Sequence, residues 1–245
     1  MRLKGLFAML ICLLIMACED TKKEVSPKAN EDKPGLVSKS DVDTIKKKKA
    51  SPPAKSGDTA TYPRISNKNV VEFLTAYGEA NTETGVRIKT SLGDIDIQLY
   101  NDTPLHRANF IYLVKQGYFN STFFHRVVPN FIIQGGNSDN IKTAKHRAKL
   151  GKYLLPAEIV DGRVHTYGTV SGAKEYRKNP DKRTAPYEFF IFLGPKSATG
   201  HLNGNYTIFG RVTSGMDVVE QIANLEADEG DWPIQNVYIS AELID

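Results

Sequence analysis

The sequence predicts a mainly β domain, a closed antiparallel β-barrel of eight strands with two helices, and an extension helix in front of it. Two patterns indicate this class. From residue 85 on, apolar residues alternate with polar ones in about eight short runs, the period of half-buried strands. Two longer segments between the runs show helical spacing instead. Closing a sheet into a barrel removes its unpaired edges, so many short strands favour that arrangement.

The predicted strands follow one another along the chain. Val86, Ile88 and Thr90 precede Gly93, and a second alternating run follows at 95–99, which indicates a hairpin. A central hairpin at 123–136 comes next. The remaining runs are 156–159, 168–173, 188–193, 206–212 and 237–244. The stretches 137–156 and 174–186 are polar and charged, and we interpret both as loops.

Three segments have helical spacing. The first helix of the domain is expected to begin at Thr103, as N-cap before Pro104, and to end at Gly117. The second runs from Ser214 to Asn224, with Ser214 as its cap. Before the domain, apolar residues at helical spacing within 67–80 predict one amphipathic helix that packs on the domain surface.

The N-terminus has the features of an export signal. A basic start precedes an apolar run from Leu6 to Ala17, which is too short to span a bilayer comfortably. The run ends in Ile15-Met16-Ala17-Cys18 and resembles a bacterial lipoprotein box, which implies lipid attachment at Cys18. The alternative is an ordinary secretory signal with a chance cysteine. We therefore expect a signal peptide at 1–17 and a protein anchored by lipid in a bacterial cell envelope, facing the periplasm or the exterior.

The next segment predicts a tether. Residues 18–62 are polar, without periodicity, and cannot bury enough apolar surface to offset the entropy of ordering. A helical extension at 63–84 and the β domain at 85–245 complete the chain. Net charge is +4 and the lysines are not interleaved with aromatics, which argues against a nucleic-acid partner. The five histidines lack metal-ligand spacing, so no metal or other cofactor is expected.

The central hairpin allows two registers. Alternation places Phe124, Arg126 and Val128 on one face of its first strand, and Ile132 and Gln134 on one face of its second. A two-residue loop would set Arg126 opposite Ile133. A three-residue loop that includes Phe131 sets Arg126 opposite Gln134, and we favour this register because it gathers a cation, an amide and apolar groups on one patch. Gly135-Gly136 is interpreted as serving a tight turn.

The unbroken hairpin sequence resembles the signature of the cyclophilins, the cyclosporin-type peptidyl-prolyl cis-trans isomerases: Phe124-His125-Arg126-Val127-Val128-Pro129-Asn130-Phe131-Ile132-Ile133-Gln134-Gly135-Gly136. The resemblance covers roughly Gly85 to Asp245 and implies an eight-stranded barrel with a helix over each end. It also implies that proline-containing proteins are the substrates.

The residues suggest how such chemistry would run. Arg126 is always charged, with several N–H groups in a rigid fork, so it is the expected donor to the prolyl nitrogen, with Gln134 and Phe131 as its catalytic partners. The resemblance implies that Ile132, Phe190 and Leu202 hold the proline together with Phe131. It further implies substrate-binding roles for a rim residue, a groove residue and an aromatic wall: His125, Ala173 and Tyr206.

Other functions are compatible with parts of the sequence. The main alternative is a chaperone or adhesion module that binds proline-containing segments in the same groove with little turnover, and a weaker one is a scaffold lipoprotein. Ser171 and His165 are part of a hydrolase set, but no Gly-x-Ser-x-Gly motif accompanies them. Lys174, Glu188 and His201 depart from the usual family residues, so peptide preference is expected to differ. We expect an isomerase that acts as a monomer on extracytoplasmic proteins as they fold.

Overall fold

The computed structural model describes residues 62–174 and 178–244; the predicted signal peptide, Cys18 and nearly all of the tether lie outside them. The strands of the described part are β1 (Ile65–Ser66), β2 (Gly85–Thr90), β3 (Gly93–Leu99), β4 (Thr122–Val128), β5 (Ile132–Asn137), β6 (Gly151–Lys152), β7 (Thr169–Gly172), β8 (Phe189–Phe192), β9 (Ile208–Ser214) and β10 (Val237–Ile244). Its helices are α1 (Val70–Ala80), α2 (Pro104–Lys115), α3 (Ile141–Leu150) and α4 (Met216–Ala223), with 3-10 helices η1 (Phe119–Ser121) and η2 (Lys196–His201).

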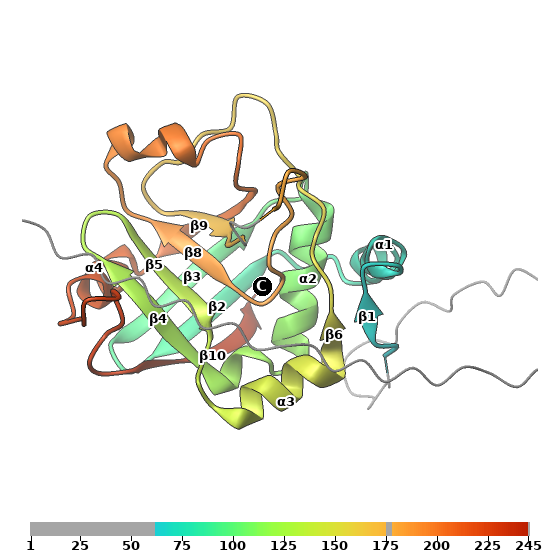
Figure 1. Ribbon diagram of the computed structural model, residues 1–245, viewed down its shortest axis with the longest axis horizontal. Helices are drawn as coiled ribbons and strands as arrows, with labels where there is room; N and C mark the ends of the chain where they lie inside the picture. Colours follow the sequence, from blue (N-terminus) through green and yellow to red (C-terminus); the bar gives the residue numbers. More distant parts are fainter. Residues whose placement is uncertain (1–61, 175–177, 245) are drawn as a thin grey trace, which may run out of the picture. The chain divides into compact units, whose positions relative to one another are not determined.

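Eight of the strands form a closed barrel, in the order β10-β2-β3-β9-β7-β8-β5-β4 (Figure 1). All neighbours are antiparallel. The last strand closes the barrel, because β10 pairs with β4 through 237–239 and with β2 through 240–244. Every barrel strand therefore has two partners and no edge is left open. The predicted fold class is confirmed.

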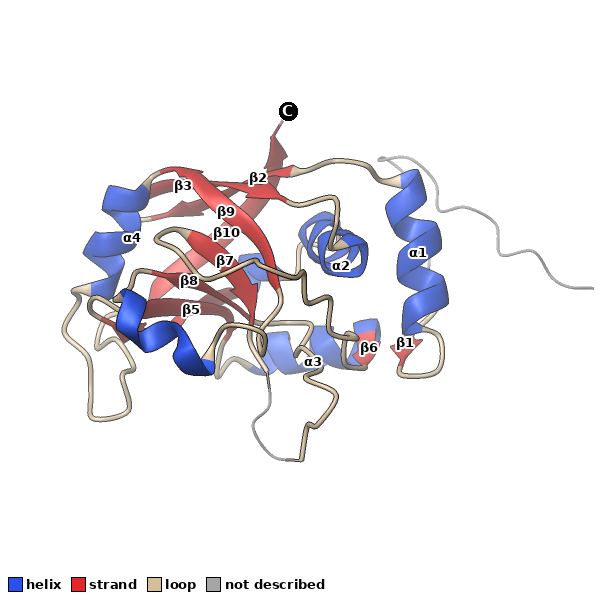
Figure 2. Ribbon diagram, turned by 90° about the horizontal axis from the view of Figure 1, so that it is seen from above, coloured by secondary structure: helices blue, strands red, loops and turns tan. Residues whose placement is uncertain are grey.

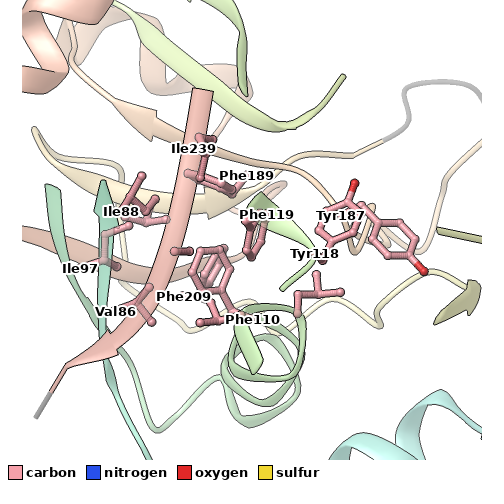
Figure 3. Close-up of a cluster of buried hydrophobic side chains, with 14 of the residues drawn as sticks. Val86, Ile88, Ile97, Phe110, Tyr118, Phe119, Tyr187, Phe189, Phe209 and Ile239 are labelled. Carbon is pink, nitrogen blue, oxygen red and sulfur yellow. The ribbon is translucent and has the colours of Figure 1, made fainter. Parts of the chain in front are cut away.

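The interior of the barrel holds the main core. Its side chains come from alternate positions of the strands and from α2 and the turn after it (Figure 3). Phe110 of α2, Phe119 of η1 and Phe189 of β8 contact one another, with ring centroids 4.9–5.7 Å apart. Aromatic pairs in such offset and edge-on geometries add roughly 0.5–1.5 kcal/mol each beyond their buried area. This cluster anchors α2 on the barrel.

Three of the described α-helices, α4, α2 and α1, lie on two sides of the barrel. Figure 2 shows α4 and α2 on opposite sides of the strands, and α1 on the outer side of α2. The predicted extension helix is thus confirmed as α1, and Tyr77 of α1 packs edge-on against Tyr112 of α2 at 5.2 Å. Because α2 is covered by both the barrel and α1, nearly all of it is buried, from His106 to Val114. The sequence alone indicates only one apolar stripe along this helix.

Arg107 fastens α1 to α2. It is buried, and its guanidinium donates to the carbonyl oxygens of Gly78 and Asn81 at the end of α1, at 3.1 and 2.8 Å. These carbonyls have no partner within the helix, so the cation satisfies them and suits the negative end of the helix dipole. The extension helix is therefore part of the same packed unit as the barrel.

Two predicted elements are corrected. The interpretation of 137–156 as a loop is wrong, because it contains α3 and β6. α3 lacks an apolar stripe and is mostly exposed; the Asn140 side chain caps it by accepting from the N–H of Lys142. The strand expected at 156–159 does not form. Its Glu158 carboxylate instead accepts hydrogen bonds from the N–H groups of Leu105 and His106, at 2.9 Å each. This stretch is therefore bonded to the first turn of α2 and not to a neighbouring strand.

The predicted helix caps also change. Thr103 is the N-cap residue of α2 by position but makes no capping hydrogen bond, because Glu158 serves the free N–H groups there. Ser214 ends β9, and Gly215, with φ of 86°, is the N-cap residue of α4. Both helices begin within one or two residues of the predicted positions.

Candidate active site

The central hairpin adopts the favoured register. Arg126 of β4 lies opposite Gln134 of β5, and Val128 lies opposite Ile132. Pro129, Asn130 and Phe131 form the three-residue loop, with Asn130 at φ of 60° and the Phe131 N–H donating to Val128 O at 3.0 Å. Asn accepts this left-handed backbone more readily than most residues. The pairing therefore brings the cation and the amide to one patch, as predicted.

The face assigned to Phe124 is wrong. The register shifts between Phe124 and Arg126, so the strand contains a β-bulge at His125. Phe124 consequently points into the core, whereas Arg126 is partly exposed on the outside. The turn expected at Gly135-Gly136 is wrong as well, since both glycines lie within β5. Gly136 has φ of 96°, and a side chain there would meet the Tyr187 carbonyl.

Strands β5 and β8 each have one face toward the barrel core and the other toward the candidate site. Ile133 of β5 and Ile191 of β8 point into the barrel, and Ile132 and Phe190, one position along each strand, point outward. The outward residues form a second apolar cluster with Phe192, Leu202 and Tyr206, against which Val128 and Phe131 pack. Strict alternation explains this result, because successive strand residues face opposite sides of a sheet. The outer cluster is an apolar floor outside the barrel.

A cavity of about 630 Å³ opens above this floor. Its lining combines the apolar floor with charged and polar groups: Arg126, Phe131, Ile132, Gln134, Ala173, Lys174, Ala185, Glu188, Phe190, His201, Leu202 and Tyr206. Eight of the nine predicted site residues of the β domain are in this set. The ninth, His125, is not; it is 9% exposed and lies behind the lining, with Nε2 3.7 Å from the Glu188 carboxylate.

The two polar side chains of the hairpin are each held by a carboxylate. Arg126 donates from Nε to Oδ2 of Asp231 at 3.0 Å, and its Nη2 lies 3.0 Å from the same oxygen. Gln134 donates from Nε2 to Oε2 of Glu188 at 3.1 Å. Glu188 is paired in turn with Arg147 of α3, at 3.4 Å. Glu188 takes one of the two N–H groups of the Gln134 amide, so the second N–H and Oε1 can both bond a ligand.

The other side of the cavity carries a lysine on an aromatic ring. The Lys174 ammonium lies 4.6 Å from the centre of the Tyr206 ring and donates to Asn205 O at 3.3 Å. Burial lowers the pKa of Lys174, and the positive charge of Lys182 lowers it further. This cation adds a positive charge to the lining beside Tyr206, so the ammonium is placed to attract an acidic side chain of a peptide.

Ser171 and His165 do meet in the structure, but away from solvent. The Ser171 hydroxyl lies 3.1 Å from Nε2 of His165, whose Nδ1 lies 2.8 Å from Asn203 Oδ1. Both residues are buried, and the imidazole stacks against the back of Phe190, at 5.9 Å and 9°. No substrate reaches this serine, so the arrangement supports the cavity floor and is not a hydrolase site.

Two buried histidines predict how the unfolding free energy depends on pH. Burial lowers the pKa of both His125 and His165 below the ordinary value, although the nearby Glu188 opposes the shift at His125. Between the folded pKa and about 6.5 the unfolded chain binds protons that the folded chain does not, so stability falls as pH drops through this window. The expected slope is up to about 1.4 kcal/mol per pH unit for each histidine.

Urea unfolding at pH 7.5, 6.5 and 5.5 measures this slope. His165→Asn, which keeps a hydrogen-bonding group but does not titrate, should flatten it. An unchanged unfolding free energy between pH 7.5 and 5.5 would contradict the assignment of these histidines as neutral groups.

Neither a metal-binding cluster nor a membrane-crossing helix is found in residues 62–174 and 178–244. These residues hold no group of three or more His, Cys, Asp or Glu side chains placed to bind a metal ion. None of their helices is long and apolar enough to cross a bilayer.

Residues 85–242 match the family model of the cyclophilin type peptidyl-prolyl cis-trans isomerases. The chain belongs to this family. It is a peptidyl-prolyl cis-trans isomerase. A relative of that name from Acinetobacter baylyi is 38% identical over 156 residues, covering 62% of this chain and 78% of the relative. One from Schizosaccharomyces pombe is 38% identical over 156 residues, covering 63% and 94%.

Solved cyclophilin structures have the same fold. A cyclophilin-type isomerase of Cryptosporidium parvum superposes with a TM-score of 0.56 at 28% sequence identity, covering 66% of this chain and 98% of that one. The same enzyme in the presence of the dipeptide Ala-Pro superposes with a TM-score of 0.55 at 28% identity, covering 66% and 99%. The match in each case is close to the length of the barrel domain, and the N-terminal part of this cyclophilin lies beyond it.

Sequence reasoning missed one residue of this cyclophilin's cavity lining and two residues that hold the lining in place. Asp231 and Arg147 are not among the predicted site residues, although Asp231 holds Arg126 directly and Arg147 holds Gln134 through Glu188. Ala185 was assigned only to a charged loop. No local signal marks any of them, because Asp231 lies among several acidic residues of a polar loop and Arg147 among several basic ones.

Proposed function

We propose that this cyclophilin accelerates Xaa-Pro isomerisation by donating a hydrogen bond from Arg126 to the prolyl nitrogen of the twisted amide. The pairing of Arg126 with Gln134 across the hairpin, beside the apolar floor of the cavity, is the observation that supports it. The Nη1 group of Arg126 has no hydrogen-bond partner in the described part of the chain. It is therefore available to a ligand.

The physical task sets what the site must supply. Rotation about a peptide bond has a barrier of roughly 18–20 kcal/mol because the nitrogen lone pair is delocalised into the carbonyl. In the twisted state the nitrogen becomes pyramidal and its lone pair can accept a hydrogen bond. A donor that is fixed beside that nitrogen stabilises the twisted state more than either planar state, and only such a difference raises the rate.

The rest of the cavity binds and orients the peptide. Phe131, Ile132 and Leu202 offer an apolar surface for the proline ring, backed by Phe190. The Gln134 amide hydrogen-bonds the peptide through Oε1 and its second N–H, because Glu188 engages only one N–H. His125 lies at the edge of the site, where its contact with Glu188 supports the carboxylate that holds Gln134.

Turnover and binding must be measured together to test this function. Exchange spectroscopy on an Ala-Pro peptide gives the isomerisation rate, and a titration of the same peptide gives its affinity. Rapid exchange in the presence of the full chain, lost in an Arg126→Lys variant that still binds the peptide, supports the proposed mechanism. Binding without exchange by the native protein would favour the binding module instead.

We also propose that the enzyme works on exported proteins from a lipid anchor at Cys18, in a bacterial cell envelope. The support is in the sequence: the apolar run that ends at Ala17-Cys18, and the polar segment that follows it. Several acyl chains on one residue give stable anchoring where a single chain is marginal. A tether between membrane and domain would let the cavity reach folding chains near the surface.

Metabolic labelling with an acyl-chain analogue checks the anchor. The native protein should be labelled and should sediment with membranes, and Cys18→Ser should be unlabelled. Cys12→Ser is the matched control and should keep the label, because residue 12 leaves with the signal peptide. Label on the Cys18→Ser protein, or none on the native one, contradicts the anchor.

A further inference from the structure

The loop between α4 and β10, residues 224–236, reaches across to the strand that carries Arg126. Asp231 at its tip binds the Arg126 guanidinium through Oδ2, 3.0 Å from both Nε and Nη2. Its backbone carbonyl accepts from the N–H of Val127 at 2.8 Å. The loop is therefore joined to β4 at two successive residues, once through the backbone and once through a charged side chain.

The loop itself is held in shape by its own hydrogen bonds. The Asp228 carboxylate accepts from the N–H groups of Gly230 and Trp232, at 2.8 and 2.9 Å, and the Asp228 N–H donates to Trp232 O. Trp232 packs edge-on against Phe123 of β4 at 5.3 Å. Asp231 sits between these anchors with φ of 64°, a conformation that Asp tolerates. The hydrogen bonds of this turn therefore hold the Asp231 carboxylate next to β4.

The contact restricts Arg126 in a specific way. Arginine is long, and the Arg126 side chain is 36% exposed, so without a partner it would sample many rotamers. Asp231 occupies the Nε edge of the fork and leaves Nη1 free to bind a ligand. A donor that is already aimed loses less entropy when it meets the transition state.

We propose that Asp231 is the positioning residue for Arg126, and that it raises kcat by orienting the guanidinium. This inference rests on the proposed role of Arg126. A carboxylate beside a cation also weakens the pull of that cation on a substrate, which is the opposite effect. Orientation outweighs that effect here, because the pair is partly exposed and water screens its charges.

Removal of the carboxylate tests the proposal. Asp231→Asn and Asp231→Gly are the variants of choice, because both residue types accept the observed backbone conformation. Glu229→Gln is the matched control: Glu229 is an exposed carboxylate of the same loop, without a hydrogen-bond or ion-pair partner in the described residues. Full-length protein in detergent is assayed for kcat and KM on an Ala-Pro peptide, and its urea unfolding midpoint is recorded.

We expect kcat to fall about tenfold in Asp231→Gly and about threefold to tenfold in Asp231→Asn, with KM within twofold of the native value. Asp231→Glu, which restores a carboxylate, should recover part of the loss. Glu229→Gln should match the native enzyme. An unchanged or higher kcat in both Asp231→Asn and Asp231→Gly overturns the proposal.

A double variant separates positioning from general structural support. If Asp231 acts through Arg126, then adding Asp231→Gly to Arg126→Ala should cause no further loss of kcat. A further tenfold loss in that background would show that the carboxylate acts by another route and would overturn the proposal. Native turnover in Arg126→Ala would remove the proposed function of Arg126 and this inference with it. A deficient Arg126→Ala beside fully active Asp231 variants would remove this inference alone.

Discussion

Arg126→Ala is expected to lower kcat/KM by two to three decades, which is about 3–4 kcal/mol of transition-state stabilisation. The size follows from what is lost: a charged donor next to an apolar floor, where removal of one preorganised donor typically costs this much. The fold should survive, because the Arg126 side chain lies on the outer face of β4 and its hydrogen bond goes to Asp231, not into the barrel core. A protease-coupled isomerisation assay on an Ala-Pro peptide measures kcat/KM, and urea unfolding checks the fold.

Lys174→Ala is the matched control for that experiment. It also removes a cation from the lining of the cavity, but one that lies over the Tyr206 ring and is not paired across the hairpin with Gln134. Its effect on turnover of a neutral peptide should be within about threefold, or less than 0.7 kcal/mol. If both variants lose turnover equally, the charge of the cavity matters and not the donor, and the role of Arg126 is contradicted.

Gly136→Ala is expected to have the largest effect on stability, about 3–5 kcal/mol of destabilisation. Two costs combine: a non-glycine residue at φ of 96°, and a methyl group 2.2 Å from the Tyr187 carbonyl oxygen. The neighbouring network would shift too, because Gly136 O accepts from the Tyr118 hydroxyl and from Arg147. Arg147 also pairs with Glu188, which holds Gln134, so turnover should fall together with stability.

Gly162→Ala separates the two costs. Gly162 also has a left-handed backbone, at φ of 75°, but a methyl group there would meet nothing within 4 Å. That variant should lose only the backbone cost, about 1–2 kcal/mol. Urea unfolding of both proteins gives the comparison. Equal destabilisation by the two substitutions would show that the approach to Tyr187 is not tight.

Much of the barrel and of the cavity floor could be predicted from local patterns. The alternation in β5 and β8 decides which residues face the core, and it also decides which ones line the cavity. The register of the central hairpin follows from the turn, because Pro129-Asn130-Phe131 accommodates a left-handed residue at Asn130. These features depend on residues within a few positions of one another, so periodicity and turn chemistry suffice.

Sequence periodicity gave wrong predictions where contacts between distant residues, and not local patterns, determine an element. α3 has no apolar stripe and is held by a cap and by Arg147, so its sequence looks like a polar loop. The bulge at His125 breaks the alternation and sends Phe124 into the core. Glu158 takes over the capping of α2 from 53 residues away, which no local cap signal predicts.

By itself the sequence determined the fold class, the hairpin register and nearly all of the cavity lining. Only the tertiary structure decided how the polar groups are held. Gln134 meets Glu188 across 54 positions of the chain, and Arg126 meets Asp231 across 105. Such long-range polar contacts leave no periodic trace, because a single acidic residue in a polar loop serves equally well as solvated surface. The closed barrel alone brings the 224–236 loop beside β4 and selects Asp231 as the partner.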